Sequence, residues 1–211
     1  MINDAMAFAA RAHEGQFRKG TRRPYIVHPR EVAEIVSTMT DDEEIISAAL
    51  LHDTIEDCAG VTREMLEQRF GTRVAEMVAQ ESEDKSLTWE ERKGETIRRL
   101  GEAPREVQMI GLADKLSNMR DIDRDYPVMG DRLWLRFRMQ SRLALAWYYK
   151  GVRDALRDGF EGTEAYEEYC SLIDKNFGPG PAPAAWKEQD GQETDCSVQA
   201  EDGSGGERAG A

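Results

Sequence analysis

The stretch that decides the fold is Ile45-Ile46-Ser47-Ala48-Ala49-Leu50-Leu51-His52-Asp53-Thr54-Ile55-Glu56-Asp57. Its first part is an almost continuous apolar run, which predicts a buried helix. Its second part holds an imidazole and three carboxylates, all able to bind a metal ion or to move a proton. Burying carboxylates without partners is costly. These groups must therefore pair with one another and with basic residues, or hold a cation.

Helical spacing continues on both sides of this stretch. Apolar residues recur every three or four positions in 3–14, and Pro29 suits the first turn of a helix that runs to about Met39. Asp41 or Asp42 can cap the helix that carries the opening stretch. Further helices are predicted over 62–70, 72–81, 88–100, 104–124 and 131–149, with two shorter ones in 151–176. Because the sequence shows little period-2 alternation and no Asn-Gly hairpin signal, it predicts an all-α fold.

Composition divides the chain at Gly178. Residues 1–178 can form one well-cored domain, whereas 179–211 begin with Pro-Gly-Pro-Ala-Pro and continue with acidic and small polar residues. Such a segment buries too little apolar surface to offset the entropy of ordering, so we expect 179–211 to be a disordered acidic tail. Thr88 and Glu91, within the domain, have the spacing of a helix capping box.

Charge and composition exclude several classes of protein. The net charge of −13 disfavours non-specific binding to nucleic acid, and an anionic substrate would need a local basic patch or a metal. No apolar run approaches the roughly 20 residues of a membrane-spanning helix, and the N-terminus lacks the shape of a signal peptide. Three widely spaced cysteines without a CxxC motif fit a reduced, cytoplasmic protein.

A candidate metal site emerges from residues in three separate elements. His28 closes the basic loop 15–28, His52 adjoins Asp53, and Asp114 lies on an apolar background within the predicted helix 104–124. This mixed set of nitrogen and oxygen ligands suits Mn²⁺, Fe²⁺, Co²⁺, Ni²⁺ or Zn²⁺, and ligand type alone does not choose among them. The third histidine, His13, is better explained as a structural residue that bonds the nearby loop.

Two more carboxylates follow at helical spacing. Glu56 is four residues after His52, and Asp57 is four residues after Asp53, so each pair shares one helix face if the helix persists. This register places Glu56 and Asp57 one turn from the metal, where they can orient or deprotonate a water. The alternative is an ordinary solvated helix end.

Three sequence blocks resemble the hydrolase domain of the RelA/SpoT-type HD family. They are Ala12-His13-Glu14-Gly15-Gln16-Phe17-Arg18-Lys19-Gly20 with Pro24-Tyr25-Ile26-Val27-His28-Pro29, then Ala48-Ala49-Leu50-Leu51-His52-Asp53-Thr54-Ile55-Glu56-Asp57, and Ala113-Asp114-Lys115-Leu116-Ser117-Asn118-Met119-Arg120. The resemblance covers roughly residues 1–150. It implies an all-α HD domain that removes the 3′-pyrophosphate of guanosine tetra- and pentaphosphate, (p)ppGpp, with Mn²⁺. The chain stops before any synthetase domain, so it resembles the small stand-alone alarmone hydrolases.

The resemblance also assigns roles residue by residue. The metal ligands match His28, His52, Asp53 and Asp114, and the catalytic acidic pair matches Glu56 and Asp57. Arg18 and Lys19 fall where the family contacts the substrate, and Asn118 falls where it contacts the ribose region. The expected partner is therefore an anionic nucleotide. Alternative readings are a solvated loop for Arg18 and Lys19, and a helix cap or bridge for Asn118.

Region 82–100 departs from the pattern of the alarmone hydrolases and keeps the substrate open. One alternative is a phosphatase of the same chemistry acting on NADPH or another nucleotide phosphate, and another is a non-catalytic nucleotide-sensing protein. Arg92 and Lys93 lie on a mostly charged helix, which favours a solvated face. The aromatic residues of the C-terminal half are expected in core packing rather than in base stacking: Trp134, Phe137, Trp147 and Tyr148.

Overall fold

The computed structural model describes residues 1–80 and 86–183. Within these two ranges the chain forms helices and no strand, with one isolated bridge between Phe17 and Pro24. The predicted all-α class is therefore confirmed. The predicted tail lies, from residue 184 onward, outside the described residues. No helix in the described ranges is long and apolar enough to cross a membrane.

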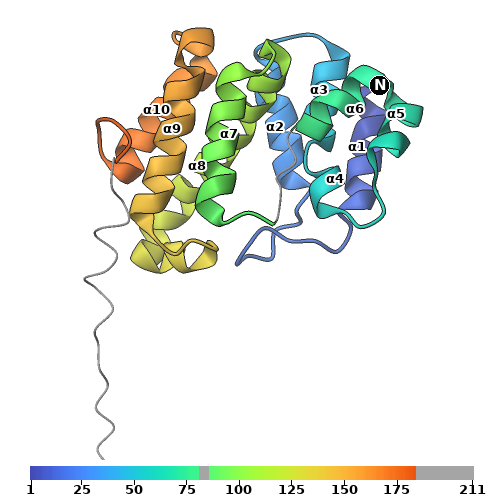
Figure 1. Cartoon of the computed structure of the whole chain (residues 1–211). Coiled ribbons are helices and arrows are strands. Elements are labelled where there is room, and N and C mark those ends of the chain that lie inside the picture. The colour runs from blue at the N-terminus through green and yellow to red at the C-terminus, as the bar shows by residue number, and fades with distance from the viewer. Residues whose placement is uncertain (81–85, 184–211) are drawn as a thin grey trace, which may run out of the picture.

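The helices form two groups joined by one long helix (Figure 1). Their bounds are α1 Ile2–Ala12, α2 Val27–Ser37, α3 Glu43–Leu51, α4 Thr54–Asp57, α5 Arg63–Phe70, α6 Thr72–Gln80, α7 Trp89–Glu102, α8 Arg105–Met129, the 3₁₀ helix η1 Gly130–Arg136, α9 Arg142–Phe160 and α10 Glu164–Phe177. In one group α3 packs against α1, α2 and α6, and in the other α9 packs against α7 and α10. Helix α8 contacts both α2 and α10, so it connects the two groups.

Helix α3 is the centre of the first group. Every residue from Ile45 to Leu51 is buried, and Leu50 and Leu51 are at most 1% exposed. Full burial of a leucine side chain is worth about 1.5–3 kcal/mol, so this run anchors the domain. Asp42 caps the helix by accepting a hydrogen bond from the backbone N–H of Glu44 at 2.9 Å.

The opening stretch does not form one continuous helix. Helix α3 ends at Leu51, and α4 begins at Thr54. The buried Thr54 hydroxyl donates to the carbonyl of Leu51 at 2.7 Å, which closes the turn between the two helices. His52 and Asp53 occupy that turn and so project from a fixed point between two helices.

The C-terminal half differs from the sequence prediction. The helix expected over 131–149 is wrong: residues 130–136 form η1, and α9 begins only at Arg142. Gly130 ends α8 with a φ of +55°, and Ser141 caps α9 by accepting from the N–H of Ala144 at 3.2 Å. The break expected near 150 is also wrong, because α9 continues through Gly151, where a Cβ would lie 2.5 Å from Ile97 Cδ1. That glycine permits close packing of α7 on α9.

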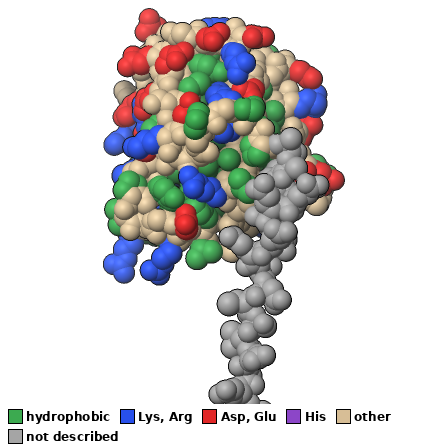
Figure 2. Space-filling view, turned by 90° about the vertical axis from the view of Figure 1, so that its left-hand side faces the viewer, with side chains coloured by type: hydrophobic (Ala, Val, Ile, Leu, Met, Phe, Trp, Pro, Cys, Tyr) green, Lys and Arg blue, Asp and Glu red, His purple; other side chains and the backbone are tan. Residues whose placement is uncertain are grey.

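Other local predictions hold. The capping box of Thr88 and Glu91 is present at the start of α7. Figure 2 shows the side of the molecule on which α9 and α10 lie. This face carries both acidic and basic side chains, with acidic ones along its upper edge and basic ones at its lower left.

Candidate active site

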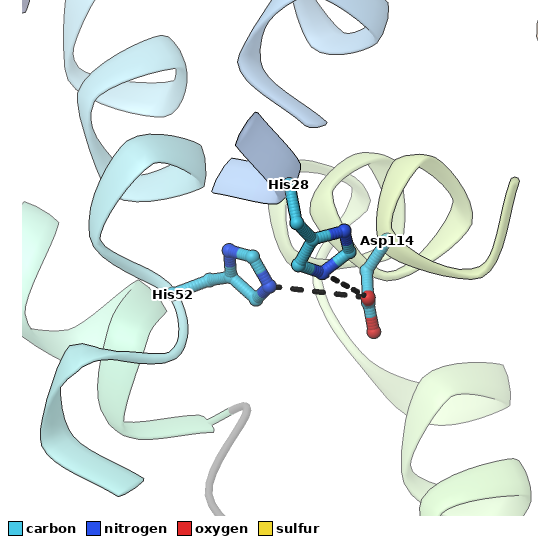
Figure 3. Close-up of side chains that lie close together, drawn as sticks. All are labelled: His28, His52 and Asp114. Atoms are coloured by element: carbon cyan, nitrogen blue, oxygen red, sulfur yellow. Dashed lines mark ion pairs between the residues drawn. The ribbon is translucent and has the colours of Figure 1, made fainter. Parts of the chain in front are cut away.

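The side chains predicted to bind a metal meet between α2, the turn after α3, and α8. His28 Nε2 lies 3.0 Å from Asp114 Oδ1 and 3.7 Å from Asp53 Oδ2. His52 Nε2 lies 3.1 Å from Asp53 Oδ2 and 3.9 Å from Asp114 Oδ1. Figure 3 shows both imidazoles pointing toward Asp114, and ligand atoms of His28, His52 and Asp114 lie within 4.8 Å of one another. This arrangement can hold one ion.

Hydrogen bonding orients both imidazoles for that task. His52 Nδ1 lies 2.8 Å from the carbonyl of Ala49, which can only accept, so the proton of the neutral ring is on Nδ1. The Nε2 lone pair then faces the carboxylates. Within the described residues this buried Nε2 has no hydrogen-bond partner, although Asp53 lies close. A lone pair directed at carboxylate oxygens needs a positive charge between them, which a proton on Nε2 supplies in the absence of metal and a divalent metal ion can replace; the donor set fits such an ion.

The electrostatics of these ligands reflect the crowding of charge. Burial opposes the charged form of His52, yet Asp53 and Asp114 outweigh burial and raise its pKa to about 9. His28 is affected most by burial, which lowers its pKa. Burial alone would raise the pKa of Asp114, but Lys115 and the two imidazoles hold it well below its usual value. The site thus keeps the carboxylate of Asp114 ionised in a buried position, which favours a bound cation.

Glu56 and Asp57 lie beside this cluster on the four-residue helix α4. The backbone N–H of Asp57 donates to the carbonyl of Asp53 at 2.9 Å, so this pair keeps its helical register despite the break after α3. The Tyr25 hydroxyl donates to Asp53 Oδ2 at 2.7 Å and lies 3.5 Å from Asp57 Oδ2. Tyr25, which is not among the predicted site residues, therefore links Asp53 of the proposed metal ligands to Asp57 of the proposed catalytic pair.

Arg18 and Asn118 belong to the same site. Arg18 donates to Asn118 Oδ1 at 2.7 Å and to Asp121 Oδ2 at 3.0 Å. Asn118 in turn donates to Asp114 Oδ1 at 2.7 Å, so it bridges the guanidinium and a candidate metal ligand. Because residues 114, 118 and 121 share one face of α8, a single helix positions all three. Lys19 is exposed in the loop before α2 and lines the same cavity.

A cavity of about 760 Å³ extends from these residues. The cavity is also lined by basic and aromatic side chains from α7, η1, α9 and the segment before α9: Trp89, Arg92, Lys93, Arg136, Phe137, Arg138 and Tyr148. Arg92 and Lys93, expected on a solvated face, are half-buried and line this cavity. Lys93 Nζ lies 4.9 Å from the ring centroid of Tyr148, which places a cation over an aromatic face at the cavity wall.

The aromatic residues expected in core packing do pack there, and two of them also have a second position. Trp134 and Tyr148 are buried in the core cluster, with Phe137 and Trp147 packed against it. Phe137 and Tyr148 additionally line the cavity. Trp89 and Lys93 lie four residues apart on one helix, and this spacing is a sequence signal that could have found part of the cavity wall. His13 is structural, as predicted: it is buried, and its Nδ1 lies 2.9 Å from Gln16 Oε1.

Residues 5–131 match the HD domain family, and the chain belongs to that family. Within it, the chain is homologous to RelA/SpoT-type enzymes. It is 41% identical to a protein of Danio rerio named guanosine-3′,5′-bis(diphosphate) 3′-pyrophosphohydrolase MESH1, over 78% of this chain and 87% of that protein. A Vibrio cholerae protein named guanosine-3′,5′-bis(diphosphate) 3′-pyrophosphohydrolase is 42% identical over 57% of this chain but only 18% of its own length.

Solved structures agree with the sequence comparison. The fold matches a structure titled "A metazoan ortholog of SpoT hydrolyzes ppGpp and plays a role in starvation responses" with a TM-score of 0.73 and 29% identity. That match covers 84% of this chain and 96% of the other. A Listeria monocytogenes structure matches with a TM-score of 0.66 and 32% identity, over 72% of this chain and 99% of the other.

Proposed function

We propose that this protein is a metal-dependent phosphohydrolase that converts (p)ppGpp to GDP or GTP and pyrophosphate. The observation that carries the proposal is the convergence of two imidazoles and two carboxylates beside a second acidic pair, within one nucleotide-sized cavity. The names of the relatives from Danio rerio and Vibrio cholerae support the same reaction. A cytoplasmic location, the domain bounds 1–178 and the roles of the site residues are part of this proposal.

His28, His52, Asp53 and Asp114 would hold the ion, which we propose to be Mn²⁺. Such an ion supplies Lewis-acid polarisation of a phosphoryl oxygen and lowers the pKa of a water near it. Glu56 and Asp57 orient the attacking water and accept its proton. The water oxygen bonds to the phosphorus attached to the ribose 3′-oxygen, the bond between that phosphorus and the 3′-oxygen breaks, and the 3′-oxygen takes up a proton.

Basic groups line the same cavity as the acidic cluster. Arg18 and Lys19 can offset the charge of the departing pyrophosphate. Lys93 and Arg138 also line the cavity, where they suit the 5′-phosphates of the same nucleotide. A substrate with phosphate groups at two positions fits this set of basic side chains.

A substrate panel tests the proposal. Purified full-length protein is incubated with ppGpp, NADPH or GTP in the presence of Mn²⁺, Mg²⁺ or Zn²⁺, and the products are separated by ion-exchange chromatography. We expect the highest kcat/KM for ppGpp with Mn²⁺. A higher kcat/KM for NADPH would support the alternative of a phosphatase acting on another nucleotide phosphate. Tight nucleotide binding without turnover would support the alternative of a non-catalytic nucleotide-sensing protein.

A further inference from the structure

The Nδ1 atom of His28 has an unusual partner. It lies 2.9 Å from the hydroxyl oxygen of Ser117 on α8, and the Ser117 hydroxyl donates to Glu31 Oε2 at 2.8 Å. His28 and Glu31 lie three residues apart on α2, and both His28 and Ser117 are at most 2% exposed. A hydrogen-bonded chain therefore runs from the half-buried carboxylate of Glu31 through a buried hydroxyl to a candidate metal ligand.

The carboxylate at the end of this chain is itself held in place. Arg120, one turn after Ser117 on α8, donates to Glu31 Oε1 at 3.2 Å. The same guanidinium forms a bidentate pair with Glu168 of α10, at 2.5 Å and 2.7 Å. Elements α2, α8 and α10 thus fix the position of Glu31 together.

A hydroxyl alone cannot decide where the proton of His28 resides, because it can donate or accept. The carboxylate of Glu31 only accepts, so the Ser117 hydroxyl donates its hydrogen bond to Glu31 and the Ser117 oxygen accepts from His28 Nδ1–H. His52 achieves the same result with the carbonyl of Ala49. In both cases the lone pair on Nε2 faces Asp53 and Asp114.

We infer that Glu31, acting through Ser117, is a positioning residue that fixes the protonated nitrogen of His28 and so directs its Nε2 toward the metal. This inference rests on the metal site of the proposed function. Neither Glu31 nor Ser117 touches the ion or the substrate. Groups that orient a ligating histidine in this way typically change metal affinity when they are removed.

The test is a double-mutant cycle read by calorimetric titration of the full-length, metal-stripped protein with MnCl₂, without nucleotide. Ser117→Ala should weaken Mn²⁺ binding about 10- to 100-fold, and Glu31→Ala should weaken it by a smaller factor. The double variant should bind like Ser117→Ala, within about twofold, because Glu31 acts only through the hydroxyl. If the double variant instead shows the two single fold-changes in Mn²⁺ affinity multiplied together, Glu31 acts independently of Ser117 through its charge alone, and the inference is overturned.

Two variants serve as matched controls. Ser47→Ala removes another fully buried hydroxyl, whose Oγ has no hydrogen-bond partner within the described residues. Glu34→Ala removes the next acidic residue of α2, which pairs with Arg30 at the surface. Both should bind Mn²⁺ like the wild type.

The outcomes separate this inference from the proposed function. Wild-type affinity in both Ser117→Ala and Glu31→Ala would overturn the inference and leave the metal site standing. A wild-type protein that binds no divalent ion would overturn both. If circular dichroism shows Ser117→Ala to be unfolded, the Mn²⁺ affinities of Glu31→Ala and Glu34→Ala are compared instead. Equal affinities in that pair would contradict the role of Glu31 in positioning His28.

Discussion

At the scale of single residues, the proposed metal ligands and the proposed catalytic pair differ in their position relative to the turn between α3 and α4. His52 and Asp53 sit in the turn between α3 and α4 and face His28 and Asp114, whereas Asp57 follows on α4. The hydrogen bond from Asp57 N–H to Asp53 O ties the second group to the first. Substitution of His52 or Asp53, which precede Thr54, should therefore weaken metal binding, whereas substitution of Glu56 or Asp57, which follow it, should mainly slow turnover.

Asp53→Ala should lose both metal and activity, because it removes a ligand. Asp57→Asn should keep the metal but lower kcat by about 10²- to 10⁴-fold, the usual contribution of general acid–base catalysis. Elemental analysis of the purified variants and initial-rate kinetics measure the two effects. Equal loss of metal in both variants would show that the division of roles is wrong.

Among the elements, α7 and α8 show what periodicity can and cannot predict. Asp114 and Asn118 lie four residues apart on α8, a spacing that puts both on one helix face, and Asn118 donates to Asp114 Oδ1. The part of the cavity wall formed by Arg136 and Phe137 was missed because both residues were expected within a helix over 131–149. They lie instead at the end of η1, whose 3₁₀ geometry after Gly130 has no clear periodic signal.

The two sides of α7 should respond differently to loss of charge. Lys93→Ala should raise KM for ppGpp about 10-fold with little change in kcat, since a hydrogen bond to a charged group is worth about 1.5–3 kcal/mol. Arg98→Ala is the control: Arg98 pairs at the surface with Glu95 and Glu102 of the same helix. Steady-state kinetics would contradict the placement of substrate along this wall if both variants kept the wild-type KM.

For the whole molecule, the buried apolar residues explain the confirmed fold class, and an ion bound at the proposed metal site would add a separate contribution to stability. The core could be predicted because its helices carry apolar residues at helical spacing, as in 3–14, or in an almost continuous apolar run, as in Ile45–Leu51. The order in which α8, η1 and α9 surround the cavity could not, because it depends on Gly130 and on contacts between distant elements.

Metal binding should therefore stabilise the fold. Mn²⁺ at 100 times its dissociation constant adds about 2.7 kcal/mol, which corresponds to a rise in Tm of roughly 5–11 °C for a domain of this size. Differential scanning fluorimetry of the metal-stripped protein with and without Mn²⁺ measures the rise. Asp53→Ala should show a much smaller increase, and an equal increase in that variant would place the ion elsewhere.

The position of water attack is tested most directly by hydrolysis of ppGpp with Mn²⁺ in ¹⁸O-labelled water, followed by mass spectrometry of the products. The proposed attack of water on the phosphorus bonded to the 3′-oxygen predicts one ¹⁸O atom in pyrophosphate and none in GDP. Inorganic phosphate as the first product, or label in the nucleotide, would contradict attack at the phosphorus bonded to the 3′-oxygen.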